Sequence, residues 1–145
     1  MTRLLVVAAV VVVAVAIAFV LQRRRPDAPV RTGFSVPDQI DRNDFVRPEA
    51  PWLVAVFTSA TCATCADVWS KAQVLASDDV AVQELEYVRD RALHDRYQID
   101  AVPALVVADR FGVVRRSFIG PVSATHLWAA MAELRGDAVP PGCSS

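Results

Sequence analysis

The sequence predicts an α/β fold in which a mixed sheet is flanked by helices, preceded by one N-terminal transmembrane helix. Two observations carry this prediction. Valine-rich, β-branched runs alternate with helical stretches in the order strand, helix, strand, helix, strand, strand, helix. An uninterrupted apolar run, residues 4–21, precedes all of them and is long enough for a membrane span.

Composition favours one domain with an apolar appendage. The chain has 145 residues, and its hydrophobic content of 54% is raised by the apolar start. A net charge of −1 gives no electrostatic footprint for nucleic acid, so no nucleic-acid partner is expected. Three cysteines are too few for a disulfide framework; Cys62 and Cys65 form a motif, and Cys143 is left over. No cofactor is expected.

The run 4–21 is predicted to anchor the chain in a membrane as a single helix. At 1.5 Å per residue it spans about 27 Å, close to a hydrocarbon core of about 30 Å. A cleaved secretory signal is the alternative, since Ala16-Ile17-Ala18 resembles a small-x-small cleavage site. The anchor is favoured because the apolar run continues past that site and because Arg3 is the one basic side chain before the run.

Positive charge predicts which side of the membrane the domain occupies. Arg23, Arg24, Arg25 and Arg31 follow the apolar run, in a basic, proline-containing linker at residues 22–33. The positive-inside rule then places the domain in the cytoplasm, on a single-pass protein of the cell membrane. An extracytoplasmic domain is the alternative.

The predicted domain spans residues 34–136, and residues 137–145 form a flexible tail. Its expected strands are 52–58, 80–88, 104–108 and 113–119; its expected helices are 62–77, 89–97 and a last one capped by Ser123 and ended by Gly136. The second helix is expected to be mostly solvated. The first three strands are expected to be parallel, with an antiparallel edge added by a hairpin at Gly112. Trp69 and Trp128 are predicted to pack in the core.

A Cys-x-x-Cys motif follows the first predicted strand and begins the first predicted helix. This order places Cys62 at a helix N-terminus, where free amides and the helix dipole stabilise a thiolate. Cys65 lies one turn along, so one thiol can attack and the other resolve. A structural zinc site needs four ligands, and His94 and His126 fall on different predicted helices, so no metal is predicted.

This stretch resembles the redox-active strand and helix of the thioredoxin family. A second segment, residues 97–107, resembles the part of that family that ends in a cis-proline before a core strand, and Pro103 lies 41 positions after Cys62. The resemblance covers roughly residues 35–135. It implies a thioredoxin-like fold, catalytic Cys62 and Cys65, and a cis Val102–Pro103 bond that faces the cysteines and binds an extended substrate segment. It also implies protein disulfides as substrates and a thiol or disulfide electron partner.

The chain departs from the family pattern around the cysteines. Thr61 stands in place of the usual tryptophan, Ala63-Thr64 in place of Gly-Pro, and Val56 in place of a buried acid six residues before Cys62. The nearby acids Glu84, Glu86 and Asp67 are expected to be solvated surface charges instead.

The resemblance predicts thiol–disulfide exchange by a specialised reductant, and the apolar run 4–21 places this activity at the membrane. Three alternatives stay open. They are an exported thiol–disulfide protein for envelope or cytochrome maturation, a redox-inactive thioredoxin-fold interaction module, and a metal or copper carrier that uses Cys62 and Cys65.

Overall fold

The computed structural model describes residues 1, 3, 7, 11–17 and 35–137. The chain divides into two units, Met1–Gly33 and Phe34–Ser145. In the first unit, residues 11–17 are helical. Among the described residues no helix combines the length and the apolar character needed to cross a bilayer. Most of the predicted membrane helix 4–21, the linker 22–33 and nearly all of the tail 137–145 lie outside the described residues and stay predictions.

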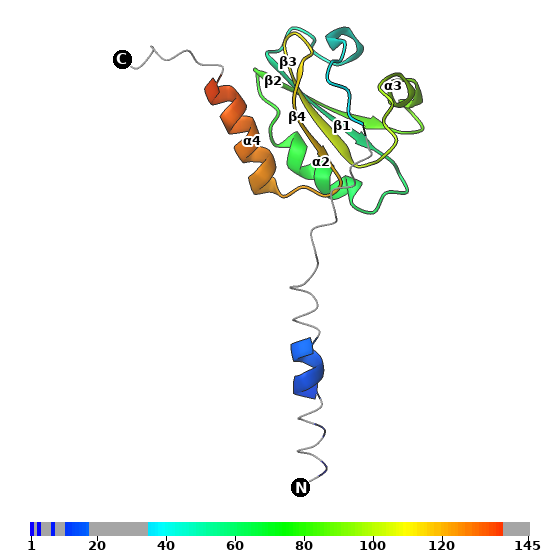
Figure 1. Ribbon diagram of the computed structural model, residues 1–145, viewed down its shortest axis with the longest axis vertical. Coiled ribbons are helices and arrows are strands. Elements are labelled where there is room, and N and C mark those ends of the chain that lie inside the picture. Colours follow the sequence, from blue (N-terminus) through cyan, green and yellow to red (C-terminus); the bar gives the residue numbers. More distant parts are fainter. Residues whose placement is uncertain (2, 4–6, 8–10, 18–34, 138–145) are drawn as a thin grey trace, which may run out of the picture. The chain divides into compact units, whose positions relative to one another are not determined.

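The second unit has the predicted order of elements (Figure 1). In chain order they are η1 (Arg42–Asp44), β1 (Trp52–Thr58), α2 (Cys65–Gln73), β2 (Val80–Glu86), α3 (Arg91–Arg96), β3 (Ala104–Asp109), β4 (Val114–Ile119) and α4 (Ala124–Asp137). The first strand has the predicted bounds, and the other elements differ from the prediction mainly at their ends.

The four strands form one sheet in the order β2-β1-β3-β4. β2 is parallel to β1, whereas β3 is antiparallel to β1 and β4 is antiparallel to β3. The prediction of three parallel strands is therefore wrong. A helix of six residues such as α3 advances only about 9 Å, whereas a seven-residue strand is about 23 Å long. α3 does not carry the chain back along the sheet: β3 begins at the end where β2 stops, with Ala104 opposite Phe57 and Glu86 opposite Thr58.

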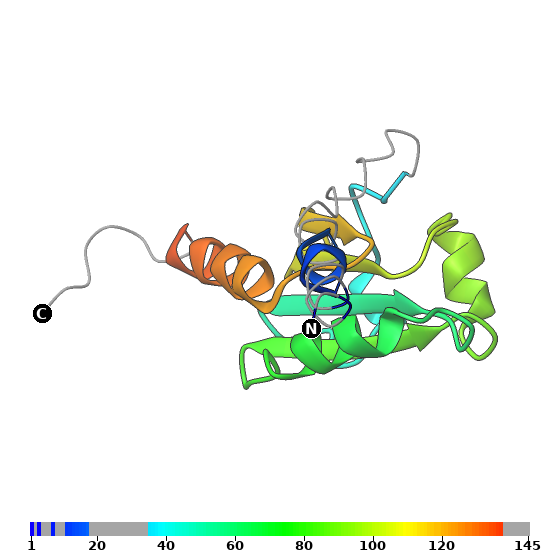
Figure 2. The same ribbon diagram turned by 90° about the horizontal axis from the view of Figure 1, so that it is seen from below.

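Strand β1 lies at the centre of the core, and all seven of its residues are buried. Leu53 and Phe57 belong to the cluster on one face of the sheet, with residues of α3 and of the segment before β1. Val54 and Val56 belong to the cluster on the other face, with residues of α2 and α4. In Figure 2 α4 (orange) lies to the left of the strands and α3 (yellow-green) to their right, with α2 drawn in front of them. Burial on both faces explains why the run is apolar throughout rather than alternating.

The last helix, α4, packs against the sheet through one face, and its other face is exposed. Ser123 caps it as predicted, since the Ser123 Oγ accepts a hydrogen bond from the His126 N–H at 3.2 Å. Leu127 is fully buried, but Trp128 is 45% exposed, so its predicted core position is wrong. Successive residues point about 100° apart on a helix, and the Trp128 ring instead donates a hydrogen bond to the Lys71 carbonyl on α2. The helix also continues past the predicted stop at Gly136 to Asp137.

The hairpin between β3 and β4 turns at Gly112, whose φ of +78° confirms the predicted positive value. Asp109 closes this turn by accepting hydrogen bonds from the Phe111 and Val113 N–H groups, and it pairs with Arg115 at 2.7 Å. Burial would raise the pKa of Asp109, but the hydrogen bonds and the charge of Arg115 outweigh it and lower that pKa. A Cβ at Gly112 would meet the Ile40 carbonyl oxygen at 2.0 Å, so only glycine fits there.

Candidate functional site

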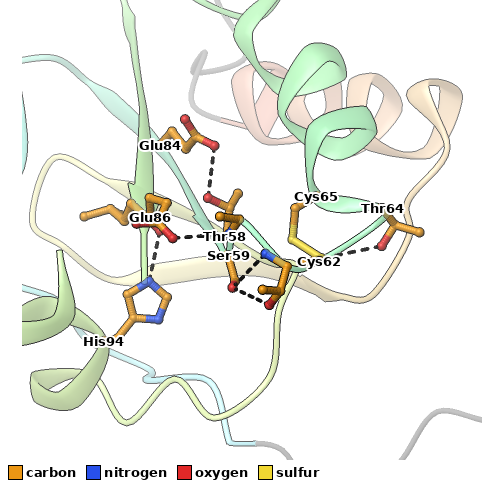
Figure 3. The surroundings of a disulfide bond; sticks show 11 residues. Thr58, Ser59, Cys62, Thr64, Cys65, Glu84, Glu86 and His94 are labelled. Atoms are coloured by element: carbon orange, nitrogen blue, oxygen red, sulfur yellow. Dashed lines mark hydrogen bonds between the residues drawn. A yellow bond between two sulfur atoms is a disulfide. The ribbon is translucent and has the colours of Figure 1, made fainter. Parts of the chain in front are cut away.

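A short turn connects the end of β1 to Cys62. The Cys62 N–H donates a hydrogen bond to the Ser59 carbonyl at 3.0 Å. The Ser59 hydroxyl accepts one from the Thr61 N–H at 3.4 Å and lies 3.1 Å from the Thr61 hydroxyl. Serine and threonine hydroxyls commonly organise turns in this way. The Thr-Ser-Ala-Thr stretch thus carries the chain from the sheet edge to the cysteine (Figure 3).

Helix α2 begins at Cys65, three residues later than predicted. Thr64 is its N-cap, and the Val68 N–H donates to the Thr64 carbonyl at 3.2 Å. The Cys65 N–H donates to the Cys62 carbonyl at 3.4 Å. Cys62 therefore lies in the turn just before the helix rather than in its first turn. The positive end of the helix dipole still points toward this turn, because Cys62 precedes the first helical residue.

The two cysteine sulfurs form a disulfide, with a Cα–Cα distance of 5.5 Å. This distance is in the usual range for disulfides. The two residues are unequally exposed: Cys65 is 3% exposed, whereas Cys62 is half-buried at the surface. The Thr64 hydroxyl lies 3.8 Å from the Cys62 sulfur (Figure 3). A partner molecule can therefore reach Cys62 more readily than Cys65.

The expected cis peptide bond between Val102 and Pro103 is present. Phe57 is opposite Ala104 in the antiparallel register of β1 and β3, so Pro103 lies beside the end of β1 from which the turn to Cys62 begins. The Gly120 N–H donates to the Pro103 carbonyl at 2.7 Å and fixes this loop to the end of β4. Within residues 35–137, no hydrogen bond is formed by the Val102 backbone N–H or carbonyl.

The position six residues before Cys62 is apolar in the structure as well as in the sequence. Val56 is fully buried in the cluster between the sheet and the helices α2 and α4. Glu84 is opposite Val56 in the parallel register of β1 and β2, and its carboxylate accepts a hydrogen bond from the Thr58 hydroxyl at 2.9 Å. Asp67 is 57% exposed and pairs with Lys71 at 2.6 Å. Asp67 is therefore the solvated charge that was predicted, whereas Glu84 is partly buried.

The contacts of Glu86 with the turn before Cys62 were not predicted from the sequence. Its carboxylate accepts hydrogen bonds from the N–H groups of Ala60, Val88 and Arg89. The pKa of Glu86 is lowered, chiefly by the hydrogen bond from the Arg89 amide. Desolvation opposes this shift, and the hydrogen bonds from the Ala60 and Val88 amides add to it. Glu86 was predicted to be a solvated surface charge, but it joins the turn before Cys62 to the loop after β2.

The prediction that the helix containing His94 is mostly solvated is wrong for this residue. Its side chain is 1% exposed, and its Nε2 lies 2.9 Å from the Leu85 carbonyl oxygen (Figure 3). The ring packs edge-on against Phe57 and Tyr87, with centroids 5.0 and 5.3 Å away. The apolar neighbour Leu93 was the one local signal, and the charges around it obscured the buried face of α3.

Other possible sites lie away from the cysteines. A cavity of about 520 Å³ is lined by Arg96, Tyr97 and residues near η1 and the Gly112 hairpin, and it includes neither cysteine. In the part of the chain that the structure describes, no three histidine, cysteine or acidic side chains gather as metal ligands would.

Comparison with known proteins supports the fold. No protein-family profile and no curated protein sequence matches the chain. Among solved structures, a thioredoxin variant from Halobacterium salinarum is 21% identical, with a TM-score of 0.55, over 70% of this chain and 95% of its own.

Two further structures are similar. An oxidised thioredoxin O2 from Arabidopsis thaliana is 23% identical, with a TM-score of 0.52, over 61% of this chain and 78% of its own. Thioredoxin 1 from Thermosipho africanus is 14% identical, with a TM-score of 0.54, over 59% of this chain and 97% of its own. The resemblance to thioredoxins is thus confirmed at the level of the fold: the chain has a thioredoxin-like fold with a Cys62–Cys65 disulfide after its first strand.

Proposed function

We propose that the chain is a thiol–disulfide oxidoreductase that acts on protein disulfides through Cys62 and Cys65. The observation that carries this proposal is the unequal exposure of the two bonded cysteines. They follow the end of β1 beside which Pro103 also lies. Nucleophilic attack needs an accessible sulfur, and resolution needs a second sulfur that stays within reach of the first. Cys62 fits the first role and Cys65 the second.

The proposed exchange has two steps. The Cys62 thiolate attacks one sulfur of a partner disulfide, which forms a mixed disulfide and releases the first partner thiolate. The Cys65 thiolate then attacks the Cys62 sulfur, which releases the second partner thiolate and leaves the Cys62–Cys65 disulfide. Two electrons pass to the partner, and a separate dithiol must later reduce the pair.

Val102 is proposed to hold the partner during this exchange. Its backbone N–H and carbonyl form no hydrogen bond within residues 35–137, and Pro103 next to it lies beside the end of β1. Free backbone groups of this kind can pair with an extended peptide in the manner of an added strand.

The direction of electron flow and the location are further parts of the proposal. We propose that the protein is a reductant held at the cell membrane by residues 4–21, with its domain in the cytoplasm. The apolar run and the arginines that follow it support this orientation. Labelling of single cysteines or a reporter fusion at the C-terminus would test the orientation, and an external C-terminus would contradict it.

A redox titration of the full chain with Cys143→Ser tests the chemistry. A midpoint near about −270 mV, as in thioredoxin, is expected for a reductant. A value near about −120 mV would favour an exported oxidant and contradict the cytoplasmic location. If the pair shows no reversible redox step, the exchange mechanism is wrong and an interaction module is favoured.

Two variants test the roles of the cysteines. Cys65→Ser should accumulate mixed disulfides between Cys62 and partner proteins, because the resolving thiol is absent. Cys62→Ser should form none and should lose exchange activity. Full activity in both variants would contradict the mechanism.

A further inference from the structure

The Glu86 carboxylate bridges two segments of the chain that differ in function. One oxygen, Oε1, accepts a hydrogen bond from the Ala60 N–H at 3.2 Å. The other, Oε2, accepts from the N–H groups of Val88 and Arg89 at 2.9 and 3.1 Å. Ala60 belongs to the turn that carries Cys62, whereas Val88 and Arg89 belong to the loop after β2. Figure 3 shows Glu86 on the side of this turn away from Cys65.

Glu86 itself is held firmly by its neighbours. Its N–H donates to the Asp90 carboxylate at 2.9 Å, and its carbonyl accepts from the Asp90 N–H at 2.7 Å. Arg89 adds to this network, because its side chain donates to the Asp90 carboxylate and to the Glu84 carbonyl. The carboxylate therefore projects from a fixed backbone and can fix what it binds.

The turn has few other ties to the rest of the molecule. β1 pairs with β2 as far as Thr58, whose carbonyl accepts a hydrogen bond from the Tyr87 N–H at 2.9 Å. Between Thr58 and Cys62 the remaining hydrogen bonds of the described chain join turn residues to one another. The bond from Ala60 to Glu86 is thus the last link to the sheet before the attacking cysteine.

We propose that Glu86 is a positioning residue for the cysteine pair: it orders the turn before Cys62 so that the two thiols keep a high effective concentration. This inference rests on the proposed exchange function, since it concerns how readily the pair closes. A turn that is already ordered when the thiols are reduced loses less conformational entropy when the disulfide forms. Glu86 does not touch the reacting atoms in this scheme.

Glu86→Gln is the informative substitution. An amide has one acceptor oxygen, so it can serve either Ala60 or the pair Val88 and Arg89, while its NH₂ group faces the other donor. The bridge is broken although size and shape are kept. Glu84→Gln is the matched control, because Glu84 lies on the same strand but accepts from the Thr58 hydroxyl and not from the turn backbone.

The experiment measures the redox midpoint of the full chain carrying Cys143→Ser, with and without each substitution. Glu86→Gln is expected to lower the effective concentration of the thiols about tenfold, which raises the midpoint by about 30 mV for this two-electron couple. Glu84→Gln should leave the midpoint unchanged. Amide hydrogen exchange should become faster at Ala60 in Glu86→Gln alone.

Each other outcome overturns a defined part of the argument. An unchanged midpoint in Glu86→Gln, with the parent still reversible, would refute the positioning role and leave the proposed function intact. A raised midpoint accompanied by a lowered Cys62 pKa and an unchanged Ala60 exchange rate would show a charge effect and also refute it. A parent protein without a reversible redox step would refute the proposed function itself.

Discussion

Reduction of the Cys62–Cys65 disulfide should destabilise the domain by about 2 kcal/mol without unfolding it. The bond joins residues separated by 3 in sequence, so it constrains the unfolded chain only slightly. The chain-entropy relation for so short a ring gives about 6 cal/mol/K, or about 1.9 kcal/mol at 25 °C. A disulfide that closed a loop of about 100 residues would contribute about 4.7 kcal/mol. A pair that must open and close during exchange needs the smaller contribution.

The sign of this difference also shows whether folding lowers or raises the redox midpoint of the pair. If the oxidised form is the more stable, folding favours the disulfide, and about 1.9 kcal/mol corresponds to a midpoint about 40 mV more negative than in the unfolded chain. A more negative midpoint favours action as a reductant. An oxidant has the opposite order, because its reduced form is the more stable.

Urea unfolding of residues 34–145 with Cys143→Ser would measure the difference, in oxidised protein and in excess reductant. We expect the reduced form to unfold in one transition at a lower urea concentration. In thermal unfolding, its melting temperature should be roughly 8 to 15 °C lower. The double variant of Cys62→Ser and Cys65→Ser should match the reduced form. A reduced form as stable as the oxidised one would refute the reductant proposal, and an unfolded reduced form would refute redox cycling.

Three further predictions concern the scaffold, and urea unfolding measures each. Leu127→Ala should lower the free energy of unfolding by about 2–5 kcal/mol because this residue is fully buried. Trp128→Ala should lower it less because Trp128 is already 45% exposed, and the reverse order would contradict the packing of α4. Gly112→Ala should lower the free energy of unfolding more than Gly120→Ala. Both glycines have a positive φ, which costs roughly 1–2 kcal/mol for alanine, but only an alanine at position 112 would clash with the backbone. Equal losses in the two variants would argue against that contact. Asp109→Asn should destabilise the protein at neutral pH. The lowered pKa of Asp109 means that the stabilisation it provides is present above its ordinary pKa of about 4 and is lost as the pH falls through the lowered pKa of the folded state. The stability difference between the two proteins should therefore shrink as the pH falls through this range, and a constant difference would contradict this.

Local patterns were enough to predict the elements and the cysteine motif. β1 is recognisable because a run of seven residues buried on both faces is apolar throughout. Gly112 is recognisable because its turn needs a positive φ. Cys62 and Cys65 are recognisable from their spacing after that strand. Each of these signals depends on residues that are close in sequence.

Features set by distant parts of the chain could not be predicted in this way. Trp128 and Leu127 are both apolar neighbours on α4, and only the position of α2 and the sheet decides which one is buried. Glu86 resembles any surface acid until the turn residue Ala60 is brought to it from a different strand end. His94 is buried because α3 packs on Phe57, which precedes it by 37 positions.

The direction of β3 is the feature that joins these predictions into one site. Had β3 run parallel to β1, as the sequence first indicated, Pro103 would precede the strand at the Trp52 end of the sheet. That end lies about 23 Å from the turn that leads to Cys62, the length of a seven-residue strand. The antiparallel register places Ala104 opposite Phe57 instead, which brings Pro103 to the cysteine end. The parallel prediction and the expectation that Pro103 faces the cysteines were therefore incompatible, and the antiparallel direction of β3 is what makes the second one possible.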